Sequence, residues 1–484
     1  MSIRPLESLP GPRVAIIGGG IAGLAAAHRL HETAPSLSVT LFEAAERLGG
    51  ALRTEQQAGY LLELGADNFI TNVPWGVELC RRLGLADQLL PTRESQRRAM
   101  VVHRRKLVPV PAGFHLLSPT RMWPILRSPL LSWRGKLRVL AERFVPAANG
   151  TDDESLASFA RRRLGREAFE RLVQPLVAGI YTADAEKLSM RAALPRFVEM
   201  ERQHGGLIRA ARRAAVSDSA DESGARYGMF VAPRGGMSSI VDALAARLPA
   251  ETVRLGSAVE EIAPAAEGSW NLLVGGKAER FDAVVLAAPA RAAAALLAGF
   301  DTQLAEDLRK IEYAGSAIVL LGYRRDQIAH PLDSFGFVVP AIERRGILAA
   351  SFSSVKFEGR APSDRVLIRV FLGGAERPEQ MALDDDALRQ MAIDELAELI
   401  GTTGEPELTR VVRWPNSMPQ YHVGHVRLVE RIESRATRCP TLALAGNAYH
   451  GVGVPHCIHS GERAAERIAK SLGSSIIPYG VQAP

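Results

Sequence analysis

Residues 13–31 read RVAIIGGGIAGLAAAHRLH, in which a continuous apolar run meets a glycine-rich turn and then an alanine- and leucine-rich stretch. The apolar run has the length of a buried strand, and the stretch after the turn has the spacing of a helix. A second run, rich in β-branched residues, covers Ser38–Phe42 and ends at Glu43. Together these segments predict a strand, a helix and a parallel strand of an α/β fold.

The turn holds the pattern Gly18-x-Gly20-x-x-Gly23, which lies between strand and helix as a dinucleotide-binding fingerprint does. Glycines let the backbone approach a pyrophosphate, and a helix N-terminus offers unpaired N–H groups to it. Glu43, 20 residues after Gly23, is placed to bind ribose hydroxyls, and its charge disfavours a 2′-phosphate. We expect a Rossmann-type domain; the alternative is a glycine-rich turn in an unrelated α/β domain.

The chain has 484 residues, 47% hydrophobic and 23% charged, as in a globular protein of roughly three structural units. Only seven of its 59 basic residues are lysines, and arginine guanidinium groups suit carboxylates and phosphates. Nucleic acid, acidic lipid and a carboxylate-bearing substrate are all compatible with this composition. Three cysteines cannot form a disulfide framework, and we find no export signal or membrane-spanning run, so we expect a cytoplasmic protein.

The remaining pattern predicts two further units. Short helices are expected between residues 115 and 171, and a polar linker covers 217–228. A second sheet, antiparallel in part, is expected from strand-like runs at 253–262, 269–274, 278–286, 317–323, 336–339, 346–352 and 365–372. The last predicted elements are a helix over 385–400, a strand over 441–445 and a helix over 461–470.

Three stretches indicate which dinucleotide is bound. EAAERLGG at 43–50 and ELGADN at 63–68 resemble the second and third flavin signatures of the FAD-dependent amine oxidase and porphyrinogen oxidase group. LALAGNAYHGVGVPHCIHSGERAA at 442–465 resembles the closing motif of that group, which brings backbone N–H groups and a helix dipole to the flavin ring. The resemblance implies non-covalent FAD, bound by Gly18, Gly19, Gly20, Ile21, Ala22, Gly23, Glu43, Ala44, Arg47, Gly49, Gly50, Ala51, Gly65, Ala66, Asp67, Asn68, Val259, Trp414, Gly446, Val452, Gly453 and Val454.

Three of these residues also have simpler interpretations. Arg47 is expected to neutralise the pyrophosphate, Val259 to flank the adenine and Trp414 to lie close to the flavin. Without the resemblance, the first would be a surface charge and the other two core residues.

Four further blocks resemble oxygen-dependent protoporphyrinogen oxidases, a family that includes bacterial members oxidising coproporphyrinogen. They are QPLVAGIYTADAEKLSM at 174–190, HGGLIR at 204–209, PRGGM at 233–237 and FSSVKFEGRAP at 352–362. The resemblance implies oxidation of a porphyrinogen to a porphyrin in heme biosynthesis, with oxygen as acceptor and hydrogen peroxide as product. Protoporphyrinogen IX and coproporphyrinogen III both fit as substrates.

The same resemblance indicates the substrate contacts. They are expected from Gly179, Val338 and Phe352, and from Arg97 or Arg98, one of which would anchor a propionate. Either arginine would otherwise belong to a solvated basic face. Ala183 stands where the family often has glycine, and its methyl group is expected to narrow the pocket.

Several alternatives remain open. A flavin amine oxidase would need a lysine on a strand near the flavin, and residues 316–323 contain none. A carotenoid-type desaturase would need a longer apolar tunnel, and a non-catalytic flavoprotein would hand porphyrin to a chelatase. Histidines and Cys457 cluster near the C-terminus, but their spacing does not favour a metal site, and nucleic acid is not expected as a partner.

We expect three domains. Residues 1–75, 228–300 and 437–475 would form the FAD-binding domain, residues 76–110, 205–227 and 301–436 a substrate-binding domain on a mixed or antiparallel sheet, and residues 111–204 a helical domain. Segment 115–146 mixes tryptophan and leucine with arginine, which predicts contact with the inner face of the cell membrane; packing on the core is the alternative. Ferrochelatase or another pathway enzyme, and a second copy in a homodimer, are further partner hypotheses.

Overall fold

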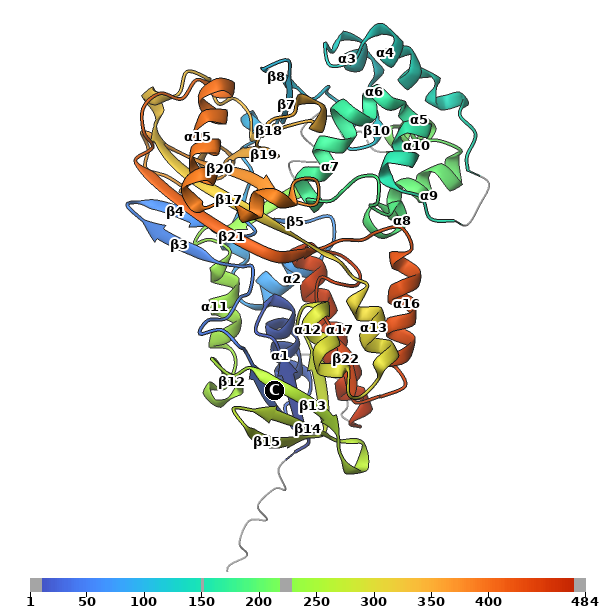
Figure 1. Ribbon diagram of the computed structural model, residues 1–484, viewed down its shortest axis with the longest axis vertical. Helices are drawn as coiled ribbons and strands as arrows, with labels where there is room; N and C mark the ends of the chain where they lie inside the picture. Colours follow the sequence, from blue (N-terminus) through green and yellow to red (C-terminus); the bar gives the residue numbers. More distant parts are fainter. Residues whose placement is uncertain (1–10, 149–151, 218–228, 474–484) are drawn as a thin grey trace, which may run out of the picture.

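The computed structural model describes residues 11–148, 152–217 and 229–473, so the predicted linker at 217–228 lies outside these ranges except for Ser217. Its described part has three regions (Figure 1). A parallel sheet with its helices forms the narrow lower region, and a larger sheet and a group of helices form the wider upper region.

The lower region is built on a five-stranded parallel sheet within the described residues. Its order is β12 (Val253–Arg254), β2 (Ser38–Phe42), β1 (Arg13–Ile17), β16 (Ala283–Leu286) and β22 (Leu442–Leu444). The apolar run therefore lies at the centre of the sheet, where Val14, Ala15 and Ile16 are fully buried. With α1 (Ile21–Thr33) between β1 and β2, the predicted strand, helix and strand are confirmed.

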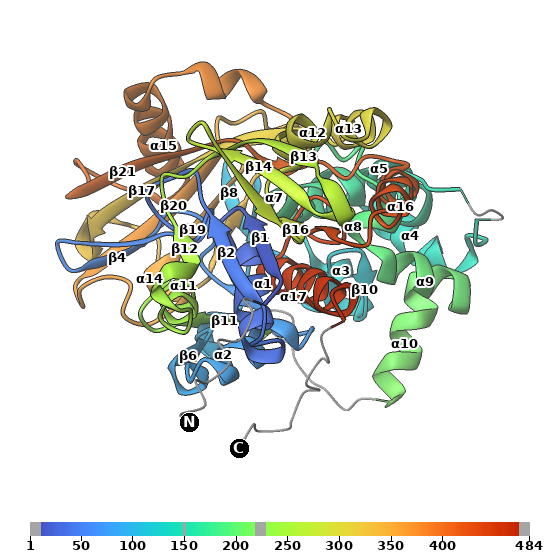
Figure 2. The ribbon, with the colours of Figure 1, turned by 90° about the horizontal axis from the view of Figure 1, so that it is seen from below.

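Each face of this sheet is covered by a different layer. One face packs against α1, α2 (Trp75–Arg82), α11 (Ser238–Ala246) and α17 (Val454–Ser471). The other packs against α12 (Ala290–Leu297), α13 (Thr302–Arg309), α16 (His425–Ala436) and an antiparallel sheet of β13 (Val259–Pro264), β14 (Trp270–Val274) and β15 (Lys277–Phe281). Figure 2 shows α1 and α17 side by side beneath the parallel strands.

The last helix begins earlier than its predicted start at Gly461. It begins at Val454, with Pro455 in the first turn, where the missing N–H of proline costs no hydrogen bond. Gly461 lies inside the helix, and a Cβ there would be 2.0 Å from the Ala22 carbonyl oxygen. This glycine therefore lets α17 cross the first turn of α1 closely; it does not mark the start of the helix.

The second sheet is mixed, as predicted, but the predicted runs at 253–262, 269–274 and 278–286 are not part of it, because they form β12 to β16 of the lower region. The described residues give the order β21 (Leu408–Pro419), β17 (Tyr313–Arg324), β20 (Arg365–Gly373), β19 (Ala349–Phe352), β18 (Gly336–Val338), β7 (Met100–His103) and β8 (Lys106–Pro109). Its pairs are antiparallel except for β18 with β7. The predicted helix α15 (Asp385–Ile400) packs on this sheet, and the basic run at 97–109 folds back as a hairpin.

The third region consists of short helices around their own apolar core. They are α3 (Met122–Arg127), α4 (Trp133–Leu140), α5 (Leu156–Leu164), α6 (Arg166–Ala168), α7 (Gln174–Tyr181), α8 (Met190–Ala193), α9 (Pro195–His204) and α10 (Leu207–Ser217). Arg163 and Glu142 form an ion pair inside this core, both with fully buried side chains. Across the ranges that the structure describes, no helix is long and apolar enough to span a membrane.

Candidate functional site

The loop between β1 and α1 has the shape that a pyrophosphate requires. A Cβ on Gly23 would lie 1.9 Å from the Gly18 carbonyl oxygen, so only glycine allows the helix to start this close to the strand. No described atom lies within 4 Å of the Cβ position of Gly20, which leaves space above the loop. No side chain of the described ranges caps α1, and its first turn has no acidic residue. The N–H groups of its first turn, which includes Ile21 and Ala22, are therefore suited to an anion.

Glu43 lies beside this loop, as its spacing predicts. Its carboxylate accepts hydrogen bonds from the amides of Gly19 (2.6 Å) and Ala45 (2.8 Å). The Gly49 amide donates to the Gly19 carbonyl oxygen at 2.8 Å, which brings the second signature against the first. Ala44 immediately follows Glu43 in the same turn.

Arg47 is bound to its own loop. Its guanidinium donates to the carbonyl oxygens of Leu48 (3.1 Å) and Gly50 (2.7 Å), and burial lowers its pKa. The side chain therefore holds the glycine turn in place, while its contact with a pyrophosphate stays a prediction.

The third signature packs against the second and against the larger sheet. A Cβ on Gly65 would lie 1.9 Å from the Ala51 carbonyl oxygen and 3.4 Å from the Trp414 ring. Trp414, in β21, donates from Nε1 to the Leu64 carbonyl oxygen at 2.7 Å. The two sheets meet at this loop, where Ala66 packs on the core of the parallel sheet.

Asp67 joins a buried charge cluster that the sequence did not reveal. It pairs with Arg369 of β20 (3.1 Å) and with Lys356 of α14 (Ser353–Lys356) (3.4 Å), and it also accepts a hydrogen bond from Nδ2 of the Asn68 side chain. Arg369 donates in addition to the Gly65 carbonyl oxygen. Burial alone would raise the pKa of Asp67, but the two cations outweigh it and hold that pKa well below its ordinary range. The larger sheet thus fixes the loop that carries the third flavin signature.

The closing loop reaches the same edge of the parallel sheet. It runs from the end of β22 to α17 and includes Gly446, whose amide donates to Ser460 Oγ at 3.0 Å, and Val452. Gly453 is the N-cap of α17 and Val454 its first residue, with no capping side chain from the described part of the chain. The helices α1 and α17 each follow a strand of the parallel sheet, so both open helix N-termini lie at the edge formed by the carboxyl ends of the strands.

Val259 lies near the ribose-binding position. It begins β13, two residues after Ser257, whose amide donates to the Glu43 carbonyl oxygen at 2.8 Å. Its side chain is half-buried and packs on the core formed with β13 to β15. A contact with adenine stays a prediction.

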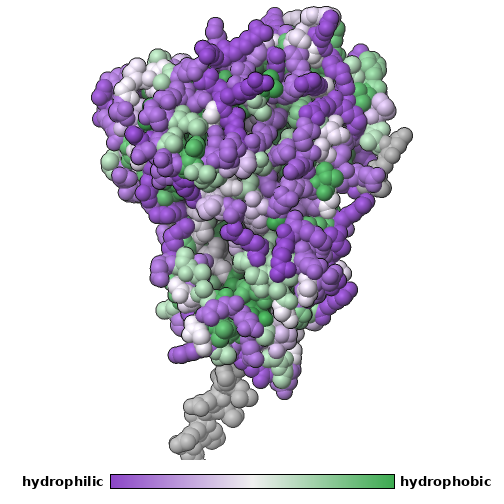
Figure 3. All heavy atoms as spheres, viewed as in Figure 1, coloured by the Kyte–Doolittle hydropathy of each residue, from purple (hydrophilic) through white to green (hydrophobic). Residues whose placement is uncertain are grey.

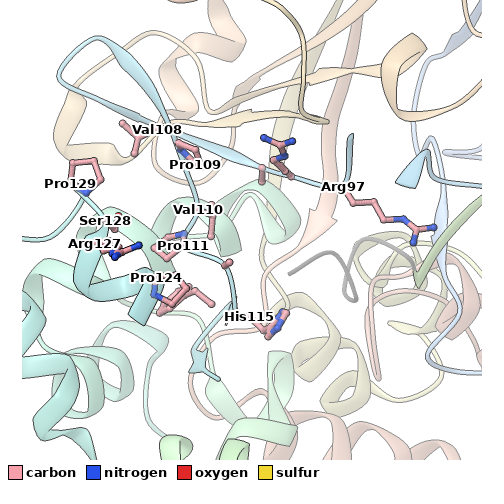
Figure 4. A pocket seen from close by; sticks show the side chains of 14 residues that line it. Arg97, Val108, Pro109, Val110, Pro111, His115, Pro124, Arg127, Ser128 and Pro129 are labelled. Carbon is pink, nitrogen blue, oxygen red and sulfur yellow. The ribbon is translucent and has the colours of Figure 1, made fainter. Parts of the chain in front are cut away.

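On the substrate side, the structure distinguishes the two candidate arginines. The side chain of Arg97 is 13% exposed and donates to Thr92 and Glu94. That of Arg98 is 56% exposed, with Asp333 at 3.6 Å. Both line a cavity of about 300 Å³ whose wall includes four prolines and two valines, and Figure 4 shows Arg97 at the opposite end from Pro129. Arg98 is therefore the freer of the two to bind an anion.

Two of the three apolar candidates meet. A Cβ on Gly179 of α7 would lie 3.7 Å from Cγ1 of Val338 in β18, and Val338 pairs with the strand that follows Arg98. Phe352, in contrast, is fully buried and packs edge-on against Phe337 at 6.1 Å in the core of the sheet. Its observed role is packing, and contact with substrate stays a prediction. Ala183 is also buried.

The C-terminal histidines and cysteine make separate contacts. His459 stacks on Trp75 at 4.0 Å, and His450 bonds to Glu433 at 2.5 Å. Residues 11–148, 152–217 and 229–473 contain no group of three His, Cys, Asp or Glu side chains arranged to hold a metal ion. Tyr421 contacts the closing loop through the Asn447 carbonyl oxygen and is not among the site residues predicted from the sequence.

The residues present fit FAD. A diphosphate requires an open helix N-terminus and a loop without side chains, and both are found at Gly18–Gly23. A carboxylate at the end of the adjacent strand and a second helix N-terminus at Gly453 complete the arrangement. The parallel sheet with this edge, joined to a larger mixed sheet, defines a dinucleotide-binding protein with a second domain.

The chain belongs to the flavin containing amine oxidoreductase family, which matches residues 21–469, and within it to the porphyrinogen oxidases. It is 32% identical to coproporphyrinogen III oxidase of Bacillus subtilis, covering 93% of this chain and 96% of that protein. It is 28% identical to protoporphyrinogen oxidase 2 of Arabidopsis thaliana, covering 97% and 96%.

Two solved structures share the fold of this chain over almost its whole length. The crystal structure of a candidate protoporphyrinogen oxidase from Exiguobacterium has a TM-score of 0.84 and 28% identity, covering 96% of this chain and 99% of that one. Cyclohexylamine oxidase from Brevibacterium oxydans, at TM-score 0.70 and 18% identity over 96% and 100%, shares the fold.

Proposed function

We propose that the protein oxidises a porphyrinogen to the porphyrin in heme biosynthesis, with non-covalent FAD. The observation that carries the proposal is the match over almost the whole chain to coproporphyrinogen III oxidases at 32% and 34% identity. FAD, when bound, supplies a two-electron acceptor. Three rounds remove six hydrogen atoms from the substrate, and reduction of three oxygen molecules gives three molecules of hydrogen peroxide.

The protein's own contribution is binding and orientation. Arg98 binds a propionate at the cavity, because its guanidinium matches a carboxylate and is more than half exposed. Gly179, which is exposed on α7 next to Val338, offers a flat macrocycle a surface without a side chain. Positioning of this kind can lower the barrier to hydrogen transfer by several kcal/mol, since it holds the reacting groups in near-attack geometry.

Coproporphyrinogen III is the substrate that we favour. It has four carboxylates where protoporphyrinogen IX has two, and the cavity is lined by Arg97, Arg98, Arg127 and His115. The two relatives at 32% and 34% identity, which match almost the whole chain, both carry the coproporphyrinogen name. Turnover of both substrates side by side tests this preference; a higher kcat/KM for protoporphyrinogen would contradict it.

Anaerobic mixing of the FAD-loaded protein with reduced tetrapyrrole tests the reaction itself. We expect the flavin absorbance to bleach and the porphyrin Soret band to appear. Admission of oxygen should restore the flavin spectrum and yield three hydrogen peroxide per porphyrin. Porphyrin binding without bleaching would favour the non-catalytic flavoprotein, whereas bleaching by amines would favour an amine oxidase.

The helical region is proposed to contact acidic lipid. Trp123 (63% exposed), Trp133 (66%) and Phe144 (70%) project from α3, α4 and the turn after α4. Each has an arginine guanidinium over its ring, at 4.8 Å, 5.3 Å and 4.5 Å respectively. Apolar rings beside cations suit an anionic membrane interface. Figure 3 shows green residues among purple ones over this upper right part of the molecule.

Flotation with anionic liposomes tests this contact. The double variant Trp123→Ser/Trp133→Ser should remain with the unbound protein, while the wild type floats. Leu255→Ser, an exposed apolar residue next to β12 of the parallel sheet, is the matched control and should float. Equal flotation of the double variant would refute the contact. The three-domain division, the chelatase partner and the homodimer also stay predictions.

A further inference from the structure

Tyr421 connects two points of the closing loop. Its side chain is 2% exposed, and its hydroxyl donates to the Asn447 carbonyl oxygen at 2.5 Å. The same hydroxyl accepts a hydrogen bond from the Gly451 amide at 2.8 Å. One phenol therefore closes the loop across four residues.

The loop that it closes borders the cofactor site. Residues 446–453 link β22 to α17 at the edge where the open helix N-termini lie. Gly451 has φ +146°, and a Cβ there would be 2.7 Å from the His456 ring. The backbone here has an unusual conformation, and the Tyr421 hydroxyl satisfies two of its polar groups.

Tyr421 is fixed by contacts of its ring and of its backbone. Its ring stacks on His425 with centroids 4.0 Å apart, and its carbonyl oxygen accepts from the Ser189 amide at 2.7 Å. His425 Nε2 lies 3.2 Å from the Tyr449 carbonyl oxygen. Burial lowers the pKa of His425 to about 4, so at neutral pH this ring is uncharged and donates to that carbonyl. The phenol is thus a rigid link between the helical region and the closing loop.

The chain contains a matched comparison in Tyr449. It lies two residues before Gly451 in the same loop and is 4% exposed. Its hydroxyl has no hydrogen-bond partner among the described residues. Loss of the Tyr449 oxygen breaks no hydrogen bond to the described residues, whereas loss of the Tyr421 oxygen leaves a partly buried amide and a partly buried carbonyl oxygen without the partner that they share.

We propose that Tyr421 is a positioning residue of the oxidation: its hydroxyl holds loop 446–453 in one conformation and thereby sets the affinity and midpoint potential of the bound FAD. The inference rests on the proposed function only in that the protein binds FAD. Backbone dipoles around a flavin tune its potential, so a loop that loses two hydrogen bonds changes that potential as well as the affinity.

Tyr421→Phe and Tyr449→Phe test the inference as FAD-loaded proteins without substrate. We expect the FAD dissociation constant to rise about tenfold in Tyr421→Phe, about 1.4 kcal/mol, and its midpoint potential to fall. Tyr449→Phe should match the wild type in both. An unchanged potential in Tyr421→Phe, even with a lower melting temperature, would overturn the proposal, because it would show a merely structural role.

A second measurement covers the case in which Tyr421→Phe does not fold. Hydrogen exchange of the wild-type protein should then show the Gly451 amide protected, since it donates to a buried hydroxyl. Rapid exchange of that amide would overturn the proposal. Both experiments omit porphyrinogen, so their results can be interpreted even if the protein does not oxidise a porphyrinogen.

Discussion

The wild-type protein is expected to lose stability as the pH rises from about 4.5 to about 7, because of Glu63. Replacement of Glu63 by glutamine should remove this loss. Glu63 ends β4 (Tyr60–Glu63) and is 2% exposed. It accepts hydrogen bonds from the Met237 amide and from Thr54 Oγ1, both at 2.8 Å. Burial raises its pKa from 4.5 to about 7, although these bonds and nearby arginines oppose the rise.

The sign follows from the raised pKa. The native carboxyl binds its proton more tightly than the unfolded one, so stability falls as the pH rises from about 4.5 to about 7 and then stays level. At about 1.4 kcal/mol per pH unit, the full loss is about 3 kcal/mol. Glutamine has no such proton, and its carbonyl oxygen can still accept from Met237.

Urea unfolding between pH 5 and 9, at one fixed FAD concentration, measures the effect, since bound FAD itself shifts the midpoint. The free energy of unfolding of Glu63→Gln should exceed that of the wild type by about 3 kcal/mol at pH 8, and the difference between them should be smallest near pH 5. Glu55→Gln, half-buried in the neighbouring strand β3 (Thr54–Gln57), should keep the wild-type slope. Parallel pH profiles for the wild type and Glu63→Gln would refute the reasoning.

Three further predictions concern the site. A Cβ on Gly23 would be 1.9 Å from a carbonyl oxygen of its own turn, so Gly23→Ala should weaken FAD binding at least about tenfold by fluorescence titration. Gly299→Ala, with no described atom within 4 Å, should bind normally. Asp67→Asn leaves two largely buried cations without their carboxylate and should lower the free energy of unfolding by about 3 kcal/mol or more; a loss under about 1 kcal/mol in urea unfolding would contradict this. Arg98→Gln should raise KM about tenfold with kcat within about twofold, while Arg105→Gln, whose side chain is 81% exposed and outside the cavity, should leave both unchanged; an unaltered KM for Arg98→Gln would exclude it as the propionate anchor.

Segments whose signal is local were predicted well. The strand, the glycine turn and helix α1 follow from periodicity and from the backbone freedom of glycine, which act over a few residues. The sequence pattern places the start of α17 at Gly461, seven residues after its observed start at Val454, because glycine is typical of a helix end. Only the packing of Gly461 on Ala22 reveals that this glycine serves a helix crossing.

Short contiguous patterns are enough to predict the α/β class, the dinucleotide loop with Glu43 and the resemblance to porphyrinogen oxidases. The tertiary structure alone decided that Lys356 and Arg369 secure Asp67, that Arg98 is freer than Arg97, and that Phe352 is buried in the core. These contacts join residues far apart in the chain. Their formation depends on how the two sheets pack, and no local pattern encodes that packing.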